Sequence, residues 1–240
     1  MAIVRAIALM AGLGALVSAV VRVREPGTFP LATLMGGWFS RTPSLALILI
    51  GAGAGIATVV LVPLIGVLGG WAHITLAGPL SGQWIAMAIA SIAVKTAFVL
   101  FEELIFRGAL VSELRRRTGP AVAIGMSALV FAAAHSGRSL IDMAVLFADG
   151  IGFALAFVMT GSLWVSAIWH VSKNLSVWLF LGSGTIDLTH GPFDFQHVDA
   201  QWAIGSRGSA GLLDLAVTTL IVGLVTWSLQ RYRVGYTETI

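Results

Sequence analysis

Long apolar segments are the feature that most constrains how this chain folds. They lie at roughly 3–21, 44–69, 83–111, 119–136, 140–160, 162–182 and 211–230, and each is close to the ~20 residues that a membrane-spanning helix needs. Only 10% of the 240 residues are charged, whereas about 25% is usual in soluble domains. Because backbone in lipid must satisfy its own hydrogen bonds, we predict an all-α polytopic transmembrane bundle of about seven to eight helices, forming a single integral membrane domain over residues 1–240.

Two segments leave the exact number of spans open. The second contains Pro63, where it either kinks or continues as a short re-entrant piece through Leu76, which makes the eighth element. The first, from Ile7 to Val21, has the length of a signal-peptide core. We expect it to be an uncleaved membrane helix, because the later segments also span the membrane.

The few charges indicate how the chain sits in a membrane. The arginines cluster between spans, at positions 22, 24, 41, 115–117, 231 and 233, and seven spans place all of them on one side. The positive-inside rule makes that side cytoplasmic. A net charge of only +3 gives no reason to expect nucleic-acid binding, so the expected partners are membrane lipids. The absence of cysteine excludes a thiolate zinc site and a cysteine nucleophile.

The longest loop, residues 183–210, lies on the opposite side in this topology. It contains several potential metal ligands, namely Asp187, His190, Asp194, His197 and Asp199. Their spacing matches no common metal-binding pattern, so we interpret the segment as an ordinary polar loop.

Three polar clusters interrupt the apolar segments. They are Glu102-Glu103 with Arg107, then His135, then His170 with Asn174. An ionisable group in the hydrocarbon region costs about 2.5–3.5 kcal/mol on insertion scales. Groups kept there at that cost are candidates for function, and these residue types suit proton transfer and carbonyl polarisation. The alternative for each is a packing role within the bundle.

Helical spacing separates the two glutamates. Glu103 and Arg107 are four residues apart and share a face, where they form a neutralising pair. Glu102 points about 100° away and has no partner at that spacing on its C-terminal side. Lys95, two turns earlier, is a possible neighbour. Glu102 is therefore the stronger candidate for chemistry, and Glu103 is as consistent with a structural role.

His135 is predicted to lie beside Glu102. A helix break at Thr118-Gly119-Pro120 separates them, with Glu102 17 residues before Gly119 and His135 16 residues after it. In an antiparallel helical hairpin both then lie at nearly the same depth, at about 1.5 Å per residue. A carboxylate beside an imidazole is a water-activating arrangement.

His170 and Asn174 share one helix face near the middle of their segment. Two donors aimed the same way suit a developing oxyanion, and interhelical hydrogen bonding is the alternative. Two histidines and a glutamate also suit zinc. However, the chain lacks an H-E-x-x-H motif, the histidines are 35 residues apart, and asparagine is a poor zinc ligand. We therefore expect neither a metal nor another cofactor.

The ordered set E-E-x-x-x-R, F-x-x-x-H and H-x-x-x-N on successive apolar segments resembles the CAAX protease and bacteriocin-processing family, which includes the type II CAAX prenyl endopeptidases. The resemblance covers about residues 84–182. It implies a glutamate-dependent intramembrane endopeptidase in which Glu102 activates water with His135, and His170 and Asn174 stabilise the oxyanion. Glu103 and Arg107 match the remaining motif positions as a supporting ion pair.

The expected activity is thus hydrolysis of a peptide bond in a membrane-associated or lipidated protein or peptide. The alanine- and glycine-rich composition favours a prokaryotic cell membrane. One alternative is a non-catalytic scaffold, immunity protein or chaperone with the same fold. Another is a transporter that uses Glu102, Lys95, Asp142 and Asp149 as a proton relay, although the chain has no internal repeat of the kind transporters show.

Overall fold

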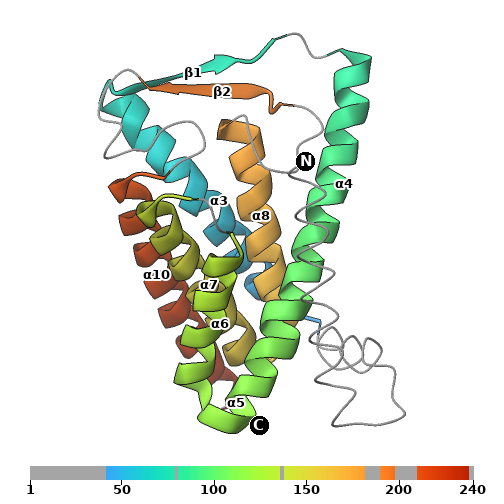
Figure 1. Cartoon of the computed structure of the whole chain (residues 1–240), viewed down its shortest axis with the longest axis vertical. Coiled ribbons are helices and arrows are strands. Elements are labelled where there is room, and N and C mark those ends of the chain that lie inside the picture. Colours follow the sequence, from blue (N-terminus) through green and yellow to red (C-terminus); the bar gives the residue numbers. More distant parts are fainter. Residues whose placement is uncertain (1–41, 79–80, 136–137, 182–189, 198–209, 238–240) are drawn as a thin grey trace.

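The structure is a computed structural model, and it describes residues 42–78, 81–135, 138–181, 190–197 and 210–237. Within these ranges the chain is almost entirely helical (Figure 1). Its helices are α3 (Leu45–Leu68), α4 (Gly82–Glu103), the π-helix η1 (Leu104–Val111), α5 (Ser112–Thr118), α6 (Pro120–Ala134), α7 (Leu140–Thr160), α8 (Leu163–Leu181) and α10 (Leu212–Thr237). Two short strands, β1 (Ala72–Leu76) and β2 (Phe193–His197), complete it.

Four helices of the described part are long and apolar enough to cross a membrane, and they are Leu45–Leu68, Gly82–Thr118, Leu140–Thr160 and Leu212–Arg231. The all-α membrane bundle is confirmed, but the expected seven to eight spans are more than these residues provide. Helix α6 has 15 residues, or about 22 Å, and α8 is made more polar by His170, Lys173 and Asn174. The expected first span, residues 3–21, lies outside the described residues.

The segments from α4 to α5 form one continuous helical rod of 37 residues. It starts where the Ser81 hydroxyl accepts a hydrogen bond from Trp84 N at 3.1 Å, a standard N-cap. It ends at Gly119, whose φ of +86° suits glycine, and Pro120 then opens α6 as its first residue. This turn sends α6 back along the rod, which is the predicted antiparallel hairpin.

A two-stranded antiparallel ribbon lies at one end of the bundle, opposite to α5 (Figure 1). Ala72 pairs with His197, and Leu76 pairs with Phe193. The expectation of a re-entrant helical piece through Leu76 was therefore wrong, because this segment is β1. The long loop was also more ordered than expected at 193–197, where alternating phenylalanines form β2. The rest of that loop, at 182–189 and 198–209, lies outside the described residues.

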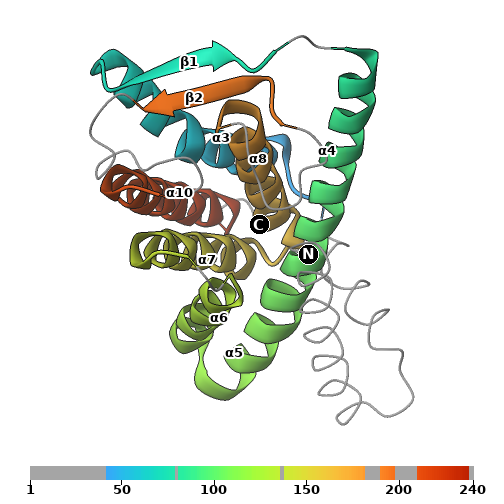
Figure 2. The same cartoon turned by 45° about the horizontal axis from the view of Figure 1, so that its top comes forward.

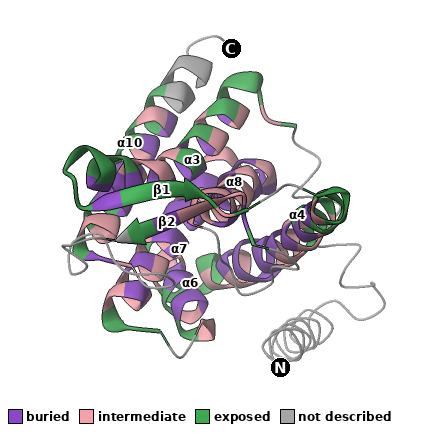
Figure 3. Cartoon of the chain, turned by 90° about the horizontal axis from the view of Figure 1, so that it is seen from above, coloured by how far each residue is buried: buried purple, intermediate pink, exposed green. Residues whose placement is uncertain are grey.

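Helices α3 and α8 pack closely through glycines on α3. A Cβ placed on Gly55 would lie 2.7 Å from Lys173 N and 2.8 Å from Ser172 Cβ, and closer still to Trp169 O. These are mostly backbone atoms, which have no rotamer with which to move away. In contrast, α4 crosses the bundle at an angle and is buried on one face and exposed on the other (Figures 2 and 3).

Gly55→Ala is expected to lower the free energy of unfolding by about 3 kcal/mol, the upper end for overpacked sites, because α3 must move away from α8. Gly53→Ala is the matched control, since nothing lies within 4 Å of a Cβ there and alanine is the better helix former. Thermal unfolding of the detergent-purified proteins makes the comparison. Equal melting temperatures for the two variants would show that the α3–α8 contact is looser than described.

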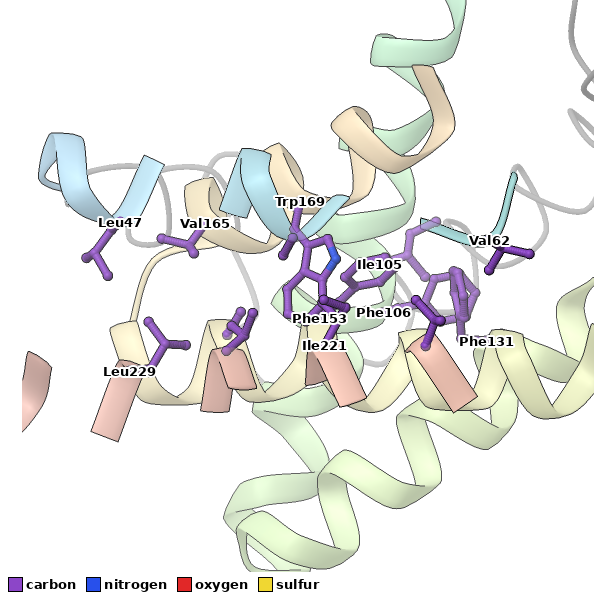
Figure 4. Close-up of a cluster of buried hydrophobic side chains, with 14 of the residues drawn as sticks. Leu47, Val62, Ile105, Phe106, Phe131, Phe153, Val165, Trp169, Ile221 and Leu229 are labelled. Atoms are coloured by element: carbon purple, nitrogen blue, oxygen red, sulfur yellow. The ribbon is translucent and has the colours of Figure 1, made fainter. Parts of the chain in front are cut away.

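The main hydrophobic core lies where α3, η1, α6, α7, α8 and α10 converge (Figure 4). Phe106, Phe131, Phe153 and Trp169 form its aromatic centre, and each is at most 1% exposed. Their rings meet edge to face, with centroids 5.3 Å apart for Phe106 and Phe131 and 5.5 Å apart for Phe153 and Trp169. This is a favoured aromatic geometry, and it forms a rigid wall beside the polar residues of α4 and α8.

Candidate active site

Glu102 lies between two histidine rings. Its Oε1 is 3.8 Å from His135 Nε2, and its Oε2 is 3.6 Å from His170 Nε2. The predicted proximity of Glu102 and His135 is thus confirmed, and their nearly equal distances from the Gly119 turn explain it. His170 approaches the same carboxylate from α8. Counting residues from the Gly119 turn could not predict this contact, because α8 is not part of that hairpin. Residues of α4 and α8, and the residue that directly follows α6, therefore converge on one point.

The second nitrogen of each ring has a partner that only accepts hydrogen bonds. His135 Nδ1 is 2.9 Å from Phe131 O, and His170 Nδ1 is 2.8 Å from Glu103 Oε1. Because neither a carbonyl nor an ionised carboxylate can donate, each ring carries its N–H at Nδ1. A neutral ring then presents the Nε2 lone pair toward Glu102. Hydrogen-bond acceptors therefore surround this point on three sides.

Glu103 has three partners although its side chain is fully buried. Its carboxylate accepts hydrogen bonds from Ser166 and from His170 Nδ1, and its Oε1 lies 3.0 Å from Arg107 Nη1. The predicted i,i+4 ion pair with Arg107 is present. Spacing did not indicate the second role of Glu103: its hydrogen bond to His170 Nδ1 fixes the orientation of that ring.

Arg107 is fully buried beside aromatic rings. Its guanidinium carbon lies 4.4 Å from the centroid of Phe131 and 5.0 Å from that of Phe153, within the range of cation–π attraction. Although the Glu103 contact has ion-pair length, no Arg107 nitrogen has a hydrogen bond of good geometry within the described residues. Charge and aromatic stacking therefore hold this cation in place more than hydrogen bonds do.

A π-helical turn separates the two acidic residues from the rest of their segment. Glu103 is the last residue of α4, and Arg107 lies within η1. A π-turn leaves carbonyls without their usual partner, and such turns occur often at functional sites. Here the buried Ser127 hydroxyl of α6 donates to Phe106 O at 2.9 Å, which satisfies one of them and ties α6 to the rod.

Asn174 lies one turn beyond His170 on the same face of α8, and it is partly buried. The structure brings the other five predicted residues into contact with one another, but within the described part it gives no hydrogen bond to the Asn174 side chain. Four residues of helix place its backbone about 6 Å along the axis from that of His170. Asn174 therefore lies beside the network of contacting residues and not within it.

Several contacting residues were missed by sequence reasoning. Ser166 lies one turn before His170, so an i,i+4 search from the histidine would have found it. Phe153 stacks on His170 with centroids 4.5 Å apart and planes at 18°, but an apolar residue in an apolar segment gives no signal. Lys173 forms an ion pair with Asp149 across α7 and α8, and their separation in sequence conceals it.

Accessibility within the site is uneven. The His135 side chain is 28% exposed, whereas those of His170, Glu103 and Arg107 are at most 5% exposed. The difference arises because α6 ends at Ala134, part-way along the bundle, and His135 follows directly. His135 is therefore the most exposed of these side chains.

The described residues contain no group of three or more histidine, cysteine or acidic side chains arranged as a metal site. Of the predicted loop candidates, His190, Asp194 and His197 lie within the described part, and Asp187 and Asp199 lie outside it. The chemistry that the main arrangement offers is that of a carboxylate base in a largely buried setting, flanked by two imidazoles whose orientation is fixed by α4 and α6.

A sequence model of one protein family matches this chain. The family is described as type II CAAX prenyl endopeptidase Rce1-like, and the match covers residues 81–176, from the start of α4 to the second half of α8. All six motif residues lie inside it. No curated protein and no solved structure matches the chain. The resemblance predicted from the three motifs is therefore confirmed over this segment.

Proposed function

We propose that this chain, an integral membrane protein related through residues 81–176 to the Rce1-like type II CAAX prenyl endopeptidases, is a glutamate-dependent intramembrane endopeptidase. Its substrate is a membrane-associated or lipidated protein or peptide. The enzyme lies in a prokaryotic cell membrane as a multi-pass protein, with lipids as its surroundings and no nucleic-acid partner.

One observation carries the proposal: Glu102 and the Nε2 atoms of His135 and His170 form a ring of acceptors within 3.8 Å of the carboxylate. Hydrogen-bond acceptors cannot bond to one another. The space between these three groups therefore favours a small molecule that donates hydrogen bonds. Water donates two hydrogen bonds and keeps lone pairs for attack.

In the reaction, the water oxygen attacks the peptide carbonyl while Glu102 takes a proton from it. The carbonyl oxygen becomes an oxyanion, which accepts hydrogen bonds from the Asn174 amide and from His170. Because His170 Nδ1 already donates to Glu103, His170 donates to the oxyanion only as the imidazolium. It reaches this state when Glu102 passes the proton taken from water to His170 Nε2, which lies 3.6 Å from Glu102 Oε2, and the two carboxylates then balance its charge. The proton comes back from His170 to Glu102 before the amine departs. Glu102 then returns its proton to the departing amine as the C–N bond breaks.

The remaining polar residues position this set. Glu103 and Ser166 hold the ring of His170, and Arg107 balances the charge of Glu103 under the Phe131 and Phe153 rings. His135 is held by Phe131 O on the more exposed side, where it assists Glu102 with the water. These roles explain why charges are retained in a segment where they are costly.

The test is cleavage by the full-length protein in detergent or proteoliposomes. The probe is a peptide ending in S-farnesylcysteine, two aliphatic residues and methionine, since such a C-terminus is the CAAX type. We expect a new amino terminus in the product, and equal rates before and after treatment with a metal chelator. Loss of activity with the chelator and recovery with zinc would contradict the metal-independent mechanism.

The competing proposal is a non-catalytic scaffold, immunity protein or chaperone. It fits the same bundle, but it does not explain why two imidazoles are turned toward the carboxylate of Glu102. The two proposals differ in one respect: a scaffold keeps its biological effect when Glu102 is replaced by glutamine, and the protease loses it.

A further inference from the structure

We infer that Lys95 binds the free C-terminal carboxylate of the substrate and so makes the enzyme selective for peptide bonds close to a chain end. This inference rests on the proposed function and adds a specificity residue to it. Lys95 lies outside the three sequence motifs and takes no part in the chemistry described above. A buried lysine in a membrane helix nevertheless needs a reason to be there.

Lys95 shares the buried face of α4 with Glu102. It is 6% exposed, and the buried residues of the helix (Ala88, Ser91, Lys95, Val99, Glu102 and Glu103) form one stripe. Seven residues separate Lys95 from Glu102, which is two helical turns. On the opposite side of the bundle interior, α8 packs against this stripe with His170 level with Glu102.

The separation matches the substrate chemistry. Seven residues of α-helix advance about 10 Å at about 1.5 Å per residue. Both side chains lean toward the helix N-terminus, so their charged ends keep nearly that offset. Three extended residues cover about 10 Å at ~3.3–3.6 Å each. In a four-residue C-terminal motif, no scissile bond is more than three residues from the free carboxylate.

The order of groups along the bundle also fits. His170 is level with Glu102, and Asn174 lies about 6 Å further along α8, toward the same end of the bundle as Lys95. A substrate whose carbonyl lies at His170 and Asn174 therefore extends its last residues toward the lysine. Ala88 and Ser91, which continue the stripe beyond Lys95, have small side chains.

The energetics favour such an exchange of partners. Lys95 already has an interaction within the protein. When substrate binds, its C-terminal carboxylate either adds to this interaction or takes its place. In a low-dielectric interior a charge-assisted hydrogen bond is stronger than at the surface. An amidated chain end offers no negative charge and leaves Lys95 without this gain, so the enzyme discriminates against it.

The experiment compares two farnesylated peptides that differ only at the terminus, one a free acid and the other an amide. The wild-type protein is expected to cleave the acid with a kcat/KM about 10- to 100-fold higher, the range for a hydrogen bond to a charged group. In Lys95→Met the ratio should fall to nearly 1, through loss of activity on the acid. Lys95→Arg, which keeps the cation, should retain most of the preference.

Lys173→Met is the matched control, because Lys173 is also a largely buried lysine near the site but is paired with Asp149. Its acid-to-amide ratio should stay at the wild-type value whatever its overall rate. A Lys95→Met protein with an unchanged ratio would overturn the inference while leaving the protease function intact. So would a wild-type protein that cleaves acid and amide equally.

If the wild-type protein cleaves neither peptide, the result counts against the proposed function itself. The role of Lys95 is then tested by peptide binding. The dissociation constants of both peptides are then measured on the full-length protein and on Lys95→Met. A preference for the acid that disappears in Lys95→Met supports carboxylate binding by Lys95. Equal constants for acid and amide on the wild-type protein reject it.

Discussion

Replacing Glu102 with glutamine is expected to reduce kcat on the farnesylated peptide by about 10²- to 10⁴-fold, the range for loss of a general base. Glutamine has the same size and still offers a carbonyl oxygen to water. However, it cannot take a proton, and its amide donates toward one of the two imidazoles. The fold should persist, because Glu102 has no ion pair as close as that of Glu103. Single-turnover cleavage measures the effect.

Glu113→Gln is the control for this substitution. It makes the same change on the same helical rod, but Glu113 lies in α5 and interacts with Arg116 and Arg117, remote from the site. Its kcat should equal that of the wild-type protein. Full biological activity of Glu102→Gln would remove the catalytic assignment and support the scaffold.

Arg107→Ala is expected to lower the free energy of unfolding by about 3–5 kcal/mol, the cost of breaking a buried ion pair. It leaves Glu103 buried without its cation and opens a cavity between the rings of Phe131 and Phe153. Because Glu103 orients His170, activity should fall as well. Denaturant or thermal unfolding in detergent provides the measurement.

Asn174→Ala is the comparison for stability. Asn174 is only partly buried and has no ion pair, so its removal should change the melting temperature much less than Arg107→Ala does. Equal stability of the two variants would argue against a structural role for Arg107. A Glu103→Gln/Arg107→Met double variant should recover part of the loss, since it removes both charges together.

The end residues of several helices could be predicted closely, because the length of an apolar segment defines them. Expected ranges such as 140–160 and 162–182 agree with α7 and α8 within one residue at each end. The number of spans could not be derived in the same way, because α6 is too short to cross a bilayer. The β1–β2 pair depends on contacts between segments more than 100 residues apart, and one carbonyl of η1 accepts a hydrogen bond from Ser127 of another helix.

The site was predictable where local spacing carried the information. The Glu103–Arg107 pair follows from i,i+4 geometry, and the Glu102–His135 contact follows from counting out from a turn. The position of His170 beside both glutamates does not, since it depends on how α8 packs against α3 and α4. Phe153 and the Asp149–Lys173 pair are equally non-local. The catalytic roles stay predictions.

The most direct test of the central claim is a high-resolution experimental density map of the full-length protein, recorded with anomalous data at the zinc edge. We predict one water within about 3.2 Å of Glu102 and of an imidazole nitrogen of His135 or His170, the reach needed for general-base catalysis. No anomalous peak should coincide with it. A metal peak at that point, or a direct contact between Glu102 and the rings that excludes water, would contradict the proposed mechanism.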